Sequence, residues 1–105
     1  MQPLVDFINE FAKDSAQLGY ELRLEDTSNA EKLTDYTKNI TYIADELAKT
    51  NESKLPTRDI LRLNLLKLTS AIQVAYLAKD TVTLADILEY ELLSELENTI
   101  SKLED

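Results

Sequence analysis

The apolar residues of the chain recur in four segments at steps of three and four residues, the period of one face of an α-helix. Each segment carries one such stripe: Leu4, Ile8, Phe11, Ser15, Leu18 and Leu22 in the first; Leu33, Tyr36, Ile40, Ile43 and Leu47 in the second; Leu61, Leu65, Leu68, Ile72 and Ala75 in the third; and Leu84, Leu88, Leu92, Leu96, Ile100 and Leu103 in the fourth. Each segment extends over about 20–24 residues, or roughly 33 Å at the rise of an α-helix. Helices of similar length joined by short connections pack antiparallel to their neighbours, so the stripes predict one bundle core.

Residues with known preferences for helix ends mark the predicted boundaries. Pro3 suits a first helical turn, where its missing N–H would be unpaired in any case. Ser28 and Glu31 have the spacing of a capping box, in which the hydroxyl and the carboxylate reciprocally satisfy backbone N–H groups. The polar residues 50–54 predict a loop, and Asp80 is expected to cap the fourth helix.

The first segment contains two features that conflict with a continuous helix. Residues 20–25 alternate between apolar and polar side chains as in a β-strand, but no second segment could pair with such a strand, and the helical stripe runs through Leu22. Gly19 inside a helix costs about 1 kcal/mol relative to Ala, so a break at this residue is a second possibility. We therefore predict an all-α fold in a single domain of residues 1–105, an antiparallel up-down-up-down four-helix bundle. The alternative is three long helices plus a short N-terminal helix.

The composition agrees with this fold and excludes several classes of function. One Gly and two Pro are few for a β protein, which needs such residues in its turns. The absence of Cys and His removes the Ser-His-Asp and Cys-His catalytic systems and the usual zinc sites. No Gly-rich phosphate-binding motif occurs in the sequence. We accordingly expect no enzymatic activity, no cofactor and no metal.

The same composition bears on location. Because there is no Cys, an oxidising compartment offers no disulfide to stabilise the fold, which favours the cytoplasm. Residues 1–6 lack the basic region and the apolar run of a signal peptide. No stretch approaches the roughly 18 apolar residues of a membrane span, so we expect no contact with a membrane.

The net charge of −9 at pH 7 disfavours nucleic acid as a partner, because the field of the protein repels phosphate. Residues 55–79 carry four basic groups and one acidic group, whereas residues 80–105 carry one basic and eight acidic groups. The last segment contains an acidic array made of Asp86, Glu89, Glu91, Glu95 and Glu97. We interpret this array either as a site for a cation or a basic partner, or as a solvated face partly neutralised by basic residues of the preceding helix, namely Arg58, Arg62, Lys67 and Lys79.

Carboxylates alone can hold Mg²⁺, which takes oxygen ligands. The run Thr83–Leu88 resembles one metal-binding motif of the helical nucleotide pyrophosphohydrolases, with Asp86 in the position of the Asp ligand. The run Asp45–Lys49 resembles the other motif. Thr83 and Lys49 stand where these motifs have Glu, so two ligands of the set are missing. The resemblance implies, as an alternative function, a divergent Mg²⁺-dependent nucleotide pyrophosphohydrolase.

The third segment differs from the others in carrying a second apolar stripe. Placed at about 100° per residue, Leu63, Leu66, Val74 and Leu77 lie nearly opposite the core stripe of the same segment. A helix in a four-helix bundle needs only one stripe to reach the core. Three interpretations are open: the helix is buried on both sides, the stripe pairs two copies of the chain, or it receives a helix of another protein.

The chain shows two further resemblances to known proteins. The run Ala78–Leu92 resembles a segment of small all-helical bacterial proteins that are themselves uncharacterised, which implies a bacterial origin. In size, acidity and helicity the chain is similar to flagellar and secretion export chaperones, which shield helical termini of their clients. We expect a non-enzymatic protein–protein interaction module, an adaptor or a small chaperone, which forms a homodimer or binds a helical partner.

Overall fold

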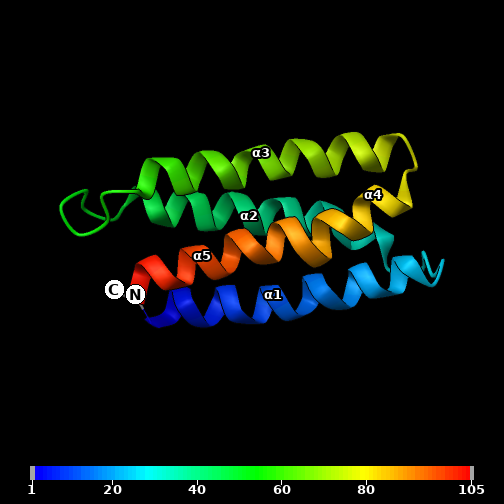
Figure 1. Cartoon of the computed structure of the whole chain (residues 1–105), viewed down its shortest axis with the longest axis horizontal. Coiled ribbons are helices and arrows are strands. Elements are labelled where there is room, and N and C mark those ends of the chain that lie inside the picture. Colours follow the sequence, from blue (N-terminus) through cyan, green and yellow to red (C-terminus); the bar gives the residue numbers. More distant parts are fainter. Residues whose placement is uncertain (1, 105) are drawn as a thin grey trace.

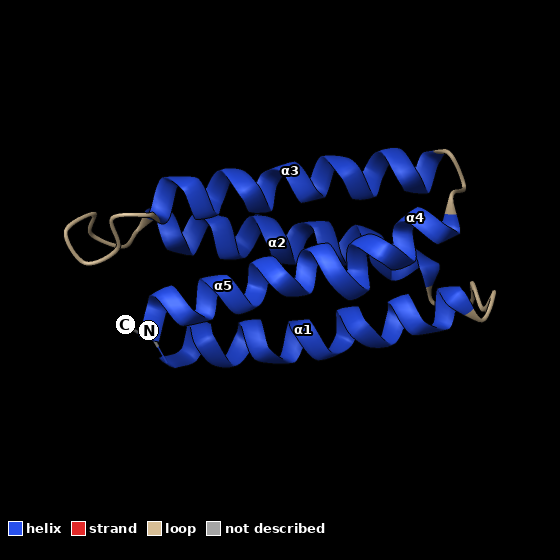
Figure 2. Ribbon diagram, in the orientation of Figure 1, coloured by secondary structure: helices blue, strands red, loops and turns tan. Residues whose placement is uncertain are grey.

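The computed structural model describes residues 2–104, and their helices run antiparallel to their neighbours along one long axis (Figure 1). Helix α1 spans Gln2–Arg23, α2 spans Leu33–Ala48 and α3 spans Arg58–Leu77. The fourth arm of the bundle consists of α4 (Thr81–Asp86), a π-helical segment (Ile87–Glu91) and α5 (Leu92–Glu104). The described residues contain no strand (Figure 2). The predicted all-α, up-down-up-down four-helix bundle is therefore confirmed.

The core lies along the common axis and is built from the predicted stripes. All the stripe positions of α1, α2 and α3 are buried, and so are Leu84, Leu88, Leu92 and Leu96 of the fourth arm. Ile100 and Leu103, near the C-terminal end of the fourth arm, are partly buried against this core. Helix α1 packs mainly against the fourth arm, and α2 packs mainly against α3. The result is an elongated molecule of 44 × 22 × 18 Å.

Helix α1 continues without a break through Gly19, so the alternative with a short N-terminal helix is wrong. Gly19 is buried where α1 meets the fourth arm. A Cβ atom at this position would lie 2.5 Å from Cγ of Glu89 and 3.3 Å from the backbone oxygen of Ala85. The glycine is therefore required by the close approach of two helices, and the core burial on both sides of it outweighs its low helix propensity.

The predicted capping box before α2 is wrong. The Ser28 hydroxyl donates to the carboxylate of Asp26 at 2.6 Å, and the Ser28 N–H donates to the same oxygen at 3.1 Å. This local turn orients the Ser28 hydroxyl toward Asp26, and no side-chain capping hydrogen bond is made at the helix start, because Ser and Asp readily hydrogen-bond to groups close in sequence. A single 3-10 turn, Ala30–Lys32, follows, and α2 begins at Leu33 with no side-chain cap.

The predicted cap of the fourth arm is confirmed. The Asp80 carboxylate accepts the backbone N–H of Thr83 at 3.0 Å and the Thr83 hydroxyl at 2.6 Å. These two hydrogen bonds stabilise the ionised carboxylate and so lower the pKa of Asp80. Asp80 therefore fixes the start of α4 and the direction in which the chain returns along the bundle.

Candidate functional site

The second apolar stripe of α3 is exposed on the outside of the bundle. The exposed fractions are 53% for Leu63, 37% for Leu66, 68% for Val74 and 80% for Leu77. The neighbouring Ile60 is 62% exposed. The interpretation that α3 is buried on both sides is therefore wrong for the single chain. These five residues are called the outer face of α3 from here on.

Ile60 was missed by the sequence reasoning. Its position, three residues before Leu63 and six before Leu66, repeats the spacing of the stripe and was the signal that could have identified it. The third helix was expected to begin near residues 56–57, and in the structure α3 begins at Arg58. Ile60 therefore lies within the helix, and the outer face extends to its first turn.

The outer face of α3 is mainly aliphatic. Between Leu66 and Val74 it carries Lys67 and Ser70, and its apolar side chains together expose roughly a few hundred Å², the range in which a surface patch is often an interface. Other large exposed apolar side chains of residues 2–104 lie elsewhere, and four of them are tyrosines, whose hydroxyl suits water. They are Tyr20, Leu24, Tyr42, Tyr76, Val82 and Tyr90.

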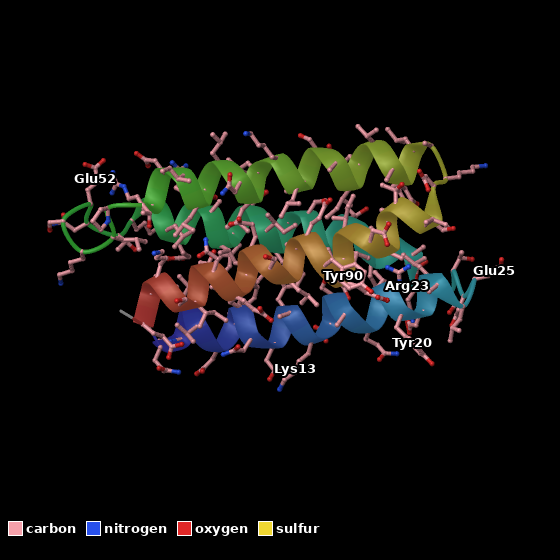
Figure 3. All side chains as sticks on the ribbon, viewed as in Figure 1. Lys13, Tyr20, Arg23, Glu25, Glu52 and Tyr90 are labelled. Carbon is pink, nitrogen blue, oxygen red and sulfur yellow. The ribbon has the colours of Figure 1, made fainter. Side chains whose placement is uncertain are left out.

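The acidic array is held by a basic residue that the sequence analysis did not assign to it. Arg23, at the end of α1, donates to the Asp86 carboxylate at 2.6 Å and to the Glu89 carboxylate at 2.8 Å. Its guanidinium also lies 5.4 Å from the ring centre of Tyr90 (Figure 3). The hydrogen bond to Asp86 is the larger cause of a raised pKa of Arg23, and the hydrogen bond to Glu89 raises this pKa further. Two members of the array thus attach the fourth arm to α1.

The expectation that basic residues of the third helix partly neutralise the acidic array is wrong for Arg58 and Arg62, whereas Lys67 lines one hollow with Glu91 and Glu95 of the array. Arg58 forms an ion pair with Glu52 at 2.8 Å and donates to backbone oxygens at the end of α2. Arg62 donates to the Ala44 oxygen at 3.0 Å. The last carbonyl groups of a helix lack intrahelical donors, so the carbonyl group of Ala48, the last residue of α2, attracts Arg58. From α3, the array receives a hydrogen bond from Asn64, to Glu95 at 3.3 Å.

The carboxylates of the alternative function do not come together. Asp86 is bound to Arg23 on the α1 side of the fourth arm. The second motif, Asp45–Lys49, lies on and just after α2, where Glu46 pairs with Lys49 at 3.3 Å. Within residues 2–104 no group of three or more side chains is arranged to hold a metal ion. The geometry therefore gives no support to a nucleotide pyrophosphohydrolase centre.

A π-helical segment in the fourth arm is a further feature that the sequence reasoning missed. The Leu92 N–H donates to the Ile87 oxygen and not to the Leu88 oxygen, which it would reach in an α-helix. The buried Ser15 hydroxyl of α1 donates to the Leu88 oxygen instead, at 2.8 Å. The signal that could have identified this segment was the run of four-residue steps from Leu84 to Ile100. Four residues make slightly more than one turn of an α-helix, so each such step moves the stripe by about 40° around the helix axis. The wider π turn returns the stripe toward the core.

A hollow of about 740 Å³ lies at the end of the bundle under the connection between α2 and α3. Leu55 and Leu103 contribute apolar surface to it, and Lys49, Lys54 and Lys102 surround them. Lys49 and Lys102 stand at the C-terminal ends of α2 and α5, where a positive charge stabilises a helix. Helix-end stabilisation accounts for two of the three lysines.

Protein-family models, curated proteins and solved structures give no match to this chain. Among residues 2–104, no helix combines the length and the apolar character needed to cross a membrane. The candidate site carried into the proposal is the outer face of α3, because its five apolar side chains are exposed.

Proposed function

We propose that this protein is a non-enzymatic protein–protein interaction module, an adaptor or a small chaperone, and that it associates as a homodimer through the outer face of α3. One observation carries the proposal. Leu63, Leu66, Val74 and Leu77 are exposed on a helix whose opposite side already supplies a complete core stripe. Their burial in an interface is thus not needed for the fold of the single chain.

The area of the outer face is sufficient for a reversible dimer. Covering roughly 300 Å² of apolar surface on each of two copies gives on the order of 15 kcal/mol of gross stabilisation. Association costs about 4–15 kcal/mol in lost freedom of motion. The balance favours a modest affinity, which suits a protein that exchanges partners.

A second copy is the preferred occupant because one surface then serves both partners. The centre of the outer face carries a single charged residue, Lys67, so two copies meet with little charge to desolvate. We also place the protein in the cytoplasm, since a chain without Cys gains no disulfide from an oxidising compartment.

The test is sedimentation velocity over a range of protein concentrations for the wild type, for Val74→Glu and for Leu24→Glu. Leu24 is the matched control, because it is 63% exposed against 68% for Val74 and lies just after α1. We expect the wild type and Leu24→Glu to sediment as dimers and Val74→Glu as a folded monomer, with helicity checked by circular dichroism. A wild type that stays monomeric throughout would contradict the proposal, as would a dimer that Val74→Glu leaves intact.

A further inference from the structure

We draw no further inference here: the strongest candidate, the lysine-lined hollow at the end of the bundle under the connection between α2 and α3, carries nothing, because Lys49 and Lys102 are accounted for by the helix ends at which they stand and Lys54 alone does not identify a ligand.

Discussion

The hydrogen bond between Ser15 and the π-helical segment allows a direct test of how the fourth arm is held. Ser15 and Leu88 are both fully buried, and the Ser15 hydroxyl donates to the Leu88 oxygen at 2.8 Å. The Leu92 N–H, which would bind this oxygen in an α-helix, donates to Ile87 instead. Ser15→Ala therefore removes a donor from a carbonyl group that water does not reach.

The expected loss of stability follows from two opposing effects. Leaving a buried carbonyl group unsatisfied costs about 1–3 kcal/mol. The better helix propensity of Ala returns about 0.5 kcal/mol of this. We expect Ser15→Ala to lower the free energy of unfolding by roughly 0.5–2.5 kcal/mol, with a fall in Tm of about 4–8 °C per kcal/mol for a domain of this size.

The assay is urea unfolding followed by circular dichroism, with all variants at the same protein concentration because dimerisation would shift the midpoint. Ser94→Ala is the matched control, since Ser94 is an exposed residue of α5 and its replacement changes helix propensity alone. We expect this control to match the wild type or to exceed it by a few tenths of a kcal/mol. The reasoning fails if Ser15→Ala is no less stable than Ser94→Ala.

Three further predictions concern the helix packing and the pH dependence of stability. Gly19→Ala should lower the unfolding free energy in urea titrations, because its Cβ would lie 2.5 Å from Cγ of Glu89, and the loss should shrink in a Glu89→Ala background. Asp80→Ala should lower Tm at pH 7. The folded-state pKa of Asp80 lies below its ordinary value of 3.8, so the stabilisation by its carboxylate is present above pH 3.8 and is lost on acidification. The Tm values of the wild type and of Asp80→Ala should therefore converge at low pH. Burial raises the pKa of Tyr36 from 10.0 to about 12, so the stability contributed by its neutral form is present below pH 10 and lost as the pH rises through 12. Urea midpoints measured from pH 9 upward should fall less steeply for Tyr36→Phe than for the exposed control Tyr42→Phe, and equal slopes would contradict the assignment.

The fold could be predicted in detail because the core is governed by a local rule. A residue is buried in a helical bundle when it repeats at the helical period, and the stripes of the four segments obey this rule without reference to any partner segment. The Asp80 cap could be predicted for the same reason, since a cap involves atoms within a few residues of each other. The failed capping box at Ser28 shows the limit of such local rules, because the Ser28 hydroxyl is oriented toward Asp26, two residues away, and caps no helix start.

Contacts between helices could not be predicted from these rules. Three such contacts depend on which side of α1 meets the fourth arm. They join Gly19 to Glu89, Ser15 to Leu88, and Arg23 to Asp86. Such pairs are separated by more than sixty residues in the sequence, and hydrophobic periodicity contains no information about which polar groups meet across a core. Arg58 and Arg62 were assigned to the acidic array because nearness in sequence was used in place of nearness in space, and both instead bind groups on or near α2.

One property of the outer face of α3 follows from the sequence, and another follows only from the tertiary structure. The sequence by itself determined that Leu63, Leu66, Val74 and Leu77 lie on one side of a helix and opposite its core stripe, because the helical period fixes direction around the axis. Whether that side meets another helix or solvent depends on how the four helices close around the core, and only the tertiary structure decided it. Helix α2 and the fourth arm cover one side of α3. The second stripe, on the opposite side, is left uncovered and available to a partner.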